Sequence, residues 1–272
     1  MKHKILIYDD HCPLCTWYSE KFVQFGFLDK NGRVPFSTLS PEYFKKIDFE
    51  KGRNEIPLLD TKTGKVLYGI DAMLEILNSK IPFINSIGNT TGIKWFLKKM
   101  YKLISYNRKV IVAQKCGIGQ IDCAPDLNYK YRILFMFLCF VFNTLMIYPI
   151  HDFILSGLSY YHLPASGLQT AHLLLVMVNC LLLFVFRKEK AVEFLGQVNM
   201  LATIVILLLS PLLVVAVFLP KLVVTAYLLA VSGFIIHEYL RRMEYAGILV
   251  LNKWIVTINF LSMTGFIFYL FN

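Results

Sequence analysis

The motif Cys12-Pro13-Leu14-Cys15 directly follows a short apolar run, Ile5-Leu6-Ile7-Tyr8. By Glu20-Lys21-Phe22-Val23 the spacing of apolar residues has become helical. Pro13 suits the first turn of a helix, because the N–H that proline lacks has no partner there in any case. The pattern therefore predicts a buried strand, a turn, and a helix whose first turn carries two thiols at C-x-x-C spacing.

Two thiols at this spacing can close a disulfide. The unpaired N–H groups at the start of a helix favour negative charge, which lowers the pKa of a thiol there from an ordinary value near ~8.5. We predict that Cys12 is the nucleophile, because it comes first on the helix, where exposure and field are greatest. Cys15 is then the resolving thiol, which releases the product from a mixed disulfide. His11 is also a predicted substrate-binding residue. A protonated His11 would stabilise the Cys12 thiolate, and an exposed loop histidine is the alternative.

A zinc site and an inert cysteine pair are the alternatives for the motif. A zinc site needs four ligands, normally two such pairs or one pair with two histidines. Cys116 and Cys123 have C-x6-C spacing, which is poor for a zinc ribbon. We therefore expect redox chemistry without a metal or an organic cofactor. The glycines between Cys116 and Cys123 allow a second redox pair, and free structural thiols are the alternative.

The second half of the chain is more apolar than an ordinary soluble protein. The chain is 56% hydrophobic and 15% aromatic, and the excess lies from Ile133 onward. A membrane-spanning helix needs about 20 apolar residues. The expected spans lie near residues 133–150, 170–186, 198–219, 222–236 and 248–270. The predicted parts are a dithiol domain at 1–92, a basic juxtamembrane linker at 93–132, and an all-α transmembrane domain of about five helices at 133–272.

Positive charge is concentrated directly before the first expected span. Residues 93–132 carry nine Lys or Arg against two Asp or Glu. This block predicts membrane topology rather than nucleic-acid binding, because no stacking motif accompanies it. The connection 187–197 holds three Lys or Arg and the connection 237–247 holds two, whereas the connection 151–169 holds none. Together they predict a multi-pass protein of the bacterial inner membrane, with the N-terminal domain in the cytoplasm and the C-terminus outside. No signal peptide is recognised, which agrees with this orientation.

The segment at 93–113 mixes aromatic residues such as Trp95 and Phe96 with lysines such as Lys94 and Lys98. It fits the last helix of the domain with a solvated face. It also fits an interfacial helix on anionic lipid, and both interpretations can hold for different faces. A lipid bilayer is therefore an expected partner of the chain.

The sequence before residue 92 alternates between strand and helix patterns. The expected strands lie at 4–8, 33–37, 56–60 and 65–68, and the expected helices at 13–25, 41–47 and 72–77. Trp17, Phe22 and Phe25 should form the apolar side of the first helix, and Asp71 should cap the last. This order of elements is typical of a thioredoxin-like, or glutaredoxin-like, α/β fold.

The chain resembles the DCC family of thiol–disulfide oxidoreductases, which is named for an Asp-x-x-Cys-x-x-Cys signature. Here the signature is Asp9, Cys12 and Cys15, and Asp10 stands where the family usually has a small residue. The resemblance covers about residues 3–130 and continues through Ile56-Pro57, Gly69-Ile70-Asp71-Ala72 and Asn107-Arg108. It implies that Asp9 tunes the cysteines or relays their protons, and a helix-capping role for Asp9 is the alternative.

The resemblance also assigns a substrate-binding role to Ile56 and Pro57. Thioredoxin-like folds carry a cis proline where Ile-Pro opens a strand opposite the dithiol. The backbone of Ile56 would then face Cys12 and pair with an incoming peptide or thiol. An ordinary trans proline at the start of a strand is the alternative.

These observations predict a membrane-anchored thiol–disulfide oxidoreductase that exchanges its dithiol with a disulfide-containing protein or a small thiol. The alternative is a membrane scaffold or transport-related protein with a non-catalytic redox-sensing or docking domain. A further alternative passes electrons to quinone through a cysteine- or histidine-bearing site in the spans. Repeated turnover of a model disulfide would distinguish a catalyst from a sensor.

Overall fold

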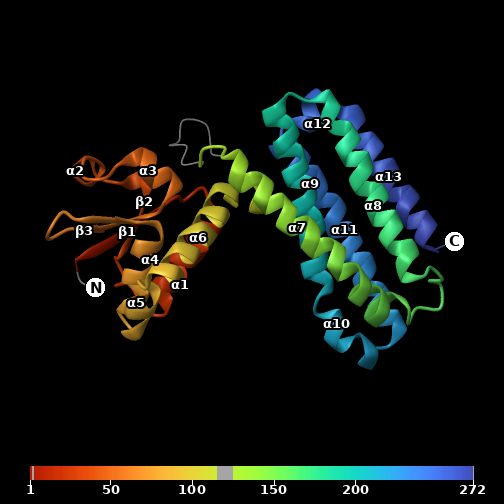
Figure 1. Cartoon of the computed structure of the whole chain (residues 1–272), viewed down its shortest axis with the longest axis horizontal. Coiled ribbons are helices and arrows are strands. Elements are labelled where there is room, and N and C mark those ends of the chain that lie inside the picture. The colour runs from red at the N-terminus through yellow and green to blue at the C-terminus, as the bar shows by residue number, and fades with distance from the viewer. Residues whose placement is uncertain (2, 115–124, 272) are drawn as a thin grey trace. The chain divides into compact units, whose positions relative to one another are not determined.

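The computed structural model describes residue 1, residues 3–114 and residues 125–271 of the chain. Two compact units are present, Met1–Arg132 and Ile133–Asn272. The elements of the first unit before Val112 are β1 (Lys4–Tyr8), α1 (Pro13–Gln24), β2 (Arg33–Pro35), a 3₁₀ helix (Phe36–Thr38), α2 (Pro41–Phe44), α3 (Phe49–Asn54), β3 (Pro57–Asp60), β4 (Val66–Tyr68), α4 (Gly69–Asn78), α5 (Phe83–Gly88) and α6 (Thr91–Ile111) (Figure 1).

The first unit is built around a four-stranded sheet in the order β2-β1-β3-β4. Strands β1 and β2 are parallel and are joined by α1, with Ile7 opposite Val34. Strand β3 runs antiparallel to β1 and to β4, with Ile5 opposite Leu59. A small mixed sheet whose first connecting helix carries the dithiol confirms the predicted α/β class, and α3 is a helix that the sequence patterns did not predict.

Side chains of β1 alternate between the two faces of the sheet, as the pleat of a strand requires. Leu6 and Tyr8 pack in a cluster that includes the two cysteines of the motif and residues of α4. Ile7 packs on the opposite face with Phe36 of the 3₁₀ helix. The helices α1 and α4 therefore cover the same face of the sheet, and the dithiol lies in the core between sheet and helices.

Helix α1 turns a different side toward the sheet than the sequence pattern predicted. Cys15 and Ser19 are buried on this helix, and Phe22 packs against the same cluster. Trp17 and Phe25 are exposed. The prediction that Trp17 and Phe25 belong to the apolar side is wrong, because the buried face follows positions 15, 19 and 22, which lie one turn apart.

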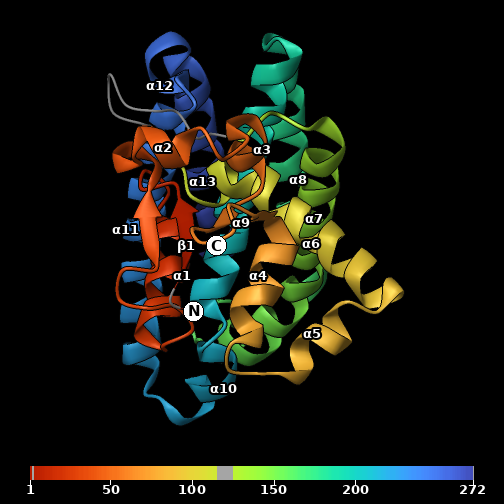
Figure 2. The same ribbon diagram turned by 90° about the vertical axis from the view of Figure 1, so that its left-hand side faces the viewer.

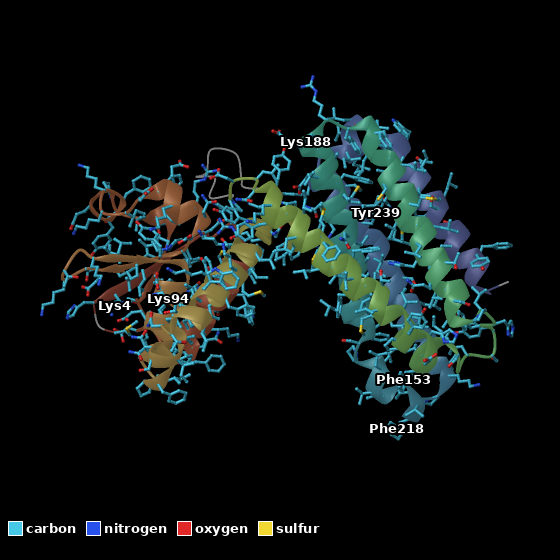
Figure 3. The ribbon with its side chains drawn as sticks, viewed as in Figure 1. Lys4, Lys94, Phe153, Lys188, Phe218 and Tyr239 are labelled. Carbon is cyan, nitrogen blue, oxygen red and sulfur yellow. The ribbon has the colours of Figure 1, made fainter. Side chains whose placement is uncertain are left out.

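Helix α4 begins at Gly69, and Asp71 lies within its first turn instead of capping it. Gly69 has a φ of 58°, a left-handed conformation that glycine adopts without strain, and it turns the chain from β4 into the helix. Asp71 instead forms ion pairs with two lysines of α6, at 2.7 Å to Lys94 and 3.5 Å to Lys98. Figure 3 shows Lys94 on α6. Helix α5 packs against both α4 and α6 (Figure 2), so these three helices form one side of the unit.

The remaining elements are helical. They are α7 (Tyr129–Ile150), a π-helical turn (His151–Leu155), α8 (Ala165–Leu182), a 3₁₀ turn (Leu183–Val185), α9 (Lys188–Leu209), α10 (Leu212–Val215), a 3₁₀ turn (Ala216–Phe218), α11 (Lys221–Tyr245), α12 (Ile248–Leu251) and α13 (Lys253–Phe271). Among the described residues, four segments are long and apolar enough to span a membrane: Tyr129–Leu155, Ala165–Val185, Lys188–Phe218 and Lys221–Tyr245. The fifth expected span corresponds to α12 and α13, and it stays a prediction.

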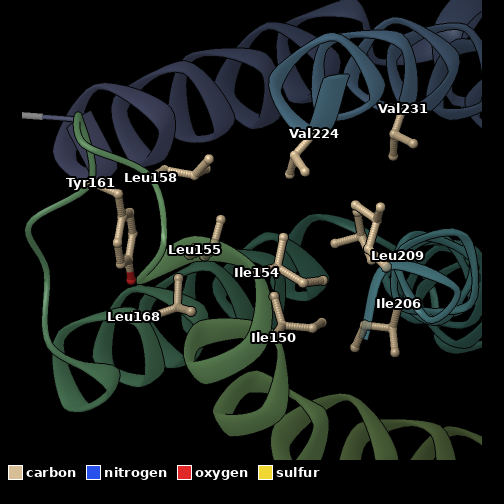
Figure 4. Packing of buried hydrophobic residues seen from close by; sticks show 11 residues of the cluster. Ile150, Ile154, Leu155, Leu158, Tyr161, Leu168, Ile206, Leu209, Val224 and Val231 are labelled. Atoms are coloured by element: carbon tan, nitrogen blue, oxygen red, sulfur yellow. The ribbon is translucent and has the colours of Figure 1, made fainter. Parts of the chain in front are cut away.

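The second unit has a core of aliphatic side chains near one end of its helices. Figure 4 shows Ile150 at the end of α7 and Ile154 in the following π-helical turn facing Ile206 and Leu209 of α9. Large apolar side chains also face outward, as Phe153 shows at the same end in Figure 3. Outward apolar side chains on long apolar helices are what contact with lipid requires.

A buried ionic group links α9 and α11 in the second unit. The Arg242 guanidinium donates to Glu238 Oε1 at 2.8 Å and to Gln197 Oε1 at 2.6 Å. Arg242 is 1% exposed, whereas Arg241, which also pairs with Glu238, has a side chain that is 38% exposed. A buried charge of this kind needs its partner, because no water replaces it.

Candidate active site around the Cys12 and Cys15 thiols

The dithiol lies where β1 ends and α1 begins. Asp9 follows the strand directly, and its carbonyl oxygen accepts the backbone N–H of Cys12 at 3.2 Å. Cys12 is the N-cap residue of α1, with φ −104° and ψ 106°, and Pro13 occupies the first helical position. Cys15 lies one turn further along the helix. The predicted strand, turn and dithiol-bearing helix are confirmed.

Both cysteines carry free thiols and are 3% exposed. The expectation that Cys12 is the more exposed thiol is therefore wrong. Both side chains belong to the core cluster between the sheet and the helices, because the turn after β1 directs the helix start inward. Electrostatics, and not exposure, must distinguish the two sulfurs.

The hydrogen bond from the Cys15 thiol lowers the pKa of Cys12 from 9.0 to about 6. Burial and the Asp9 carboxylate oppose this shift, whereas the Cys15 backbone N–H and the Arg108 guanidinium add to it. The pKa of Cys15 is raised well above its ordinary value, because its thiol donates to Cys12 and is itself buried. The Cys12 sulfur is therefore a thiolate at neutral pH, and Cys15 holds the proton.

Arg108 reaches this pair from α6, far along the chain. Its guanidinium lies 3.3 Å from Asp9 Oδ2 and 3.9 Å from Cys15 Sγ, and it donates to the carbonyl oxygen of Arg53 at 3.0 Å. Arg108 is 6% exposed and Asp9 is 3% exposed. The site therefore holds a buried cation between a carboxylate and the dithiol. The motif-based reasoning did not assign a role to Arg108, although Asn107-Arg108 belongs to the family resemblance.

Two tyrosines complete the surroundings of the sulfurs. The Tyr18 hydroxyl hydrogen-bonds Cys15, and burial raises the pKa of Tyr18 well above its ordinary value. The Tyr101 hydroxyl of α6 accepts the backbone N–H of Ile56 at 2.9 Å, and burial raises its pKa as well. Both phenols therefore stay protonated near neutral pH and can donate hydrogen bonds to a sulfur or a bound group.

The Ile56–Pro57 segment differs from its expected arrangement. The Ile56–Pro57 peptide bond is trans, so the predicted cis bond is wrong. The trans form is the lower-energy state of such a bond and leaves Pro57 paired with Tyr68 at the start of β3. The Ile56 N–H already donates to Tyr101, and its carbonyl accepts the N–H of Gly69 at 3.0 Å. The predicted pairing of Ile56 with an incoming peptide would need these bonds to break.

His11 lies in the turn between β1 and α1. Its backbone N–H donates to Asp9 Oδ1 at 3.0 Å, and its ring Nε2 lies 3.7 Å from Asp10 Oδ2. Asp10 also accepts the hydroxyl of Ser37 at 2.7 Å. The turn is thus held by both aspartates, and the substrate-binding role of His11 stays a prediction.

The proposed second redox pair, Cys116 and Cys123, lies outside the described residues. Within the described ranges, no group of three or more His, Cys, Asp or Glu side chains is placed to hold a metal ion. The two remaining described cysteines, Cys139 and Cys180, belong to α7 and α8 of the second unit.

Residues 6–113 match the family model described as DCC1-like thiol-disulfide oxidoreductase. No curated protein and no solved structure matches the chain significantly. The matched range contains Asp9, both cysteines of the motif and Arg108, so it includes the whole buried site. The N-terminal domain of this chain therefore belongs to the DCC1-like thiol-disulfide oxidoreductase family.

Proposed function

We propose that this protein is a membrane-anchored enzyme that exchanges its Cys12/Cys15 dithiol with a disulfide of a protein or a small molecule. The observation that supports this best is the difference in pKa between the two thiols. Cys12 has a pKa of about 6, and Cys15 keeps its proton. A thiolate next to a protonated thiol is the state that starts a two-step exchange.

In the first step, the Cys12 thiolate attacks one sulfur of the substrate disulfide. A bond forms between Cys12 Sγ and that sulfur, and the other substrate sulfur leaves with the bonding electron pair as a thiolate. In the second step, Cys15 loses its proton and attacks Cys12 Sγ, which releases the second substrate thiolate. The substrate has then gained two electrons as two thiolates, which take up the proton released by Cys15 and one proton from water, and the protein holds the disulfide. The reverse sequence oxidises a dithiol substrate.

Arg108 and Asp9 have roles that their positions support. The guanidinium lies 3.9 Å from Cys15 Sγ, so it stabilises negative charge on that sulfur when the proton leaves. Asp9 pairs with Arg108 at 3.3 Å and holds the cation in place. Its charge also opposes the thiolate of Cys12, which limits how far that pKa falls. Asp9 is therefore a positioning residue for Arg108 in this proposal, besides the proton relay that the family resemblance implies.

The competing function is redox sensing by a docking domain in the membrane. The burial of both thiols favours this alternative, because large substrate proteins reach a buried sulfur only after a local movement. Turnover separates the two functions. A catalyst reduces a model disulfide repeatedly when dithiothreitol re-reduces it, whereas a sensor reacts once.

The test uses the full chain in detergent. The Cys15→Ser variant should retain a disulfide-linked substrate on Cys12, which mass spectrometry of that peptide identifies. The Cys180→Ser variant, altered in the second unit, is the matched control and should turn over like the unmodified chain. Two outcomes would contradict the proposed enzyme. In one, the unmodified chain and the control both fail to turn over; in the other, Cys180→Ser loses turnover together with Cys15→Ser.

We also propose the orientation that the basic connections predict. The N-terminal domain then lies in the cytoplasm, and five spans carry the C-terminus to the outside. The four segments that could span a membrane support the membrane association. The Lys and Arg residues of the segment 93–132 and of the connections 187–197 and 237–247 support the cytoplasmic location of these segments.

A further inference from the structure

A pocket of about 330 Å³ opens beside Cys15, between α1, α4 and α6. Its walls are largely apolar side chains from all three helices: Leu14, Ile70, Met73, Leu97, Met100 and Ile104. Cys15 lines the pocket, whereas Cys12 does not. A small molecule in the pocket could therefore reach Cys15, which is the resolving cysteine of the proposed mechanism.

The polar groups that line the pocket already have partners within the protein. Arg108 is paired with Asp9 and lies close to Cys15, and the Tyr101 hydroxyl accepts the N–H of Ile56. The hydroxyl of Ser105 donates to the carbonyl oxygen of Asn54. A charged ligand would have to displace these bonds, so the pocket favours an apolar occupant.

The mouth of the pocket is apolar as well. Met100 and Ile104 line the pocket and are nevertheless 40% and 42% exposed. Three lysines of α6 are already ion-paired, Lys94 and Lys98 with Asp71 and Lys102 with Glu55. An entering group therefore meets exposed apolar side chains before it meets the sulfur.

We propose that this pocket binds a small apolar thiol, which reduces the Cys12–Cys15 disulfide by attacking Cys15. The inference rests on the proposed function, because it names the partner of the second half of that cycle. The apolar part of the thiol lies between α4 and α6, and its sulfur faces Cys15 Sγ.

The thiolate of the bound molecule forms a bond to Cys15 Sγ, the Cys12–Cys15 bond breaks, and Cys12 leaves with the electron pair. A second molecule of the same thiol attacks the mixed disulfide and releases Cys15, which takes up a proton. Two thiols thus become one disulfide, and the protein regains its dithiol.

Chemistry favours attack at Cys15 over attack at Cys12. A thiol with a lower pKa is the better leaving group in disulfide exchange. Attack at Cys15 expels Cys12, whose pKa the Cys15 backbone N–H and the Arg108 guanidinium lower even without the Cys15 thiol, whereas attack at Cys12 would expel Cys15, whose pKa burial raises. The position of the pocket and the quality of the leaving group therefore both favour attack at Cys15.

The experiment compares apolar and charged reagents of equal reactivity on the full chain in detergent. In the Cys12→Ser variant, the labelling rate of Cys15 is measured with benzyl methanethiosulfonate and with sulfonatoethyl methanethiosulfonate. Peptide mass spectrometry separates Cys15 from the other cysteines, and rates are divided by those for free cysteine. The benzyl reagent should be favoured by about tenfold or more, since burial of one aromatic group contributes about that factor.

The matched variants are Ile104→Glu and Trp95→Glu, made in the same background. Both positions are exposed on α6, but Ile104 lines the pocket and Trp95 does not. Ile104→Glu should remove most of the preference for the benzyl reagent, and Trp95→Glu should keep it. Equal labelling by both reagents, or an equal effect of the two variants, would overturn the proposal.

The second measurement uses the chain with both cysteines, oxidised to the Cys12–Cys15 disulfide. Benzyl mercaptan should reduce it faster than 2-mercaptoethanesulfonate by a similar factor, after correction for the reactivity of each thiol with a reference disulfide. The first half of the cycle is followed separately, as attack of the reduced protein on a model disulfide. If that attack proceeds and the preference is missing, the pocket proposal fails while the proposed oxidoreductase stands. If Cys12 does not attack a disulfide, the proposed function fails instead.

Discussion

The Arg108 guanidinium lies 3.3 Å from Asp9 Oδ2, and both side chains are almost completely buried beside the dithiol. The pair connects the end of β1 to α6, so it holds the two parts of the chain that form the site. A buried pair of this kind is expensive to break, because the remaining charge has no water to solvate it.

Replacement of Arg108 by methionine should raise the pKa of Cys12, because the cation that favours the thiolate is lost. The free energy of unfolding should also fall by about 3–5 kcal/mol, since Asp9 is left without its partner. The rate of Cys12 alkylation against pH and denaturant unfolding measure the two effects. The double variant Asp9→Asn, Arg108→Met is the control and should recover much of the stability. An unchanged alkylation profile in Arg108→Met would contradict the electrostatic role.

The reduced protein should alkylate at Cys12 with a midpoint near pH 6, as the pKa of about 6 requires. A pKa that is lower in the folded state stabilises the fold at pH values above the unfolded pKa. This contribution is lost as the pH falls from about 9 to about 6. The thermal midpoint of the reduced chain, relative to that of Cys12→Ser, should therefore rise as the pH increases from about 6 to about 9. A relative midpoint that falls with increasing pH would show that Cys12 is not a stabilised thiolate.

The ion pair of Glu238 with the buried Arg242 should contribute far more to the stability of the second unit than its pair with Arg241. Replacement of Glu238 by glutamine should destabilise the second unit by about 3–5 kcal/mol, because the buried guanidinium loses its counter-charge. Replacement of Arg241 by glutamine is the control and should change stability by about 1 kcal/mol or less, since the Arg241 side chain is 38% exposed and Glu238 keeps its pair with Arg242. Thermal unfolding in detergent measures both. Equal losses would mean that the burial of Arg242 does not govern this network.

Reporter fusions at the two termini test the orientation. A reporter at Met1 should report the cytoplasm, and one at Asn272 should report the outside, because basic connections remain in the cytoplasm. Both termini on the cytoplasmic side would indicate four spans, and α13 would then not cross the membrane.

The sequence alone was sufficient for features that depend on neighbours along the chain. The strand before Asp9, the helix that begins at Pro13 and the apolar helices from Ile133 onward all follow from local spacing and composition. The Asp9, Cys12 and Cys15 signature also led to the right family, because its spacing is contained in seven residues.

Only the tertiary structure determined which distant groups surround the sulfurs. Arg108 reaches Cys15 from α6, and Tyr101 occupies the Ile56 N–H that was expected to bind substrate. The burial of Cys12 and the outward position of Trp17 depend on which side of α1 meets the sheet. The spacing of apolar residues predicts that a segment is helical. Which face of the helix is buried depends on packing against elements far apart in the sequence. For the same reason, no local pattern could reveal the pocket beside Cys15, whose walls come from three helices.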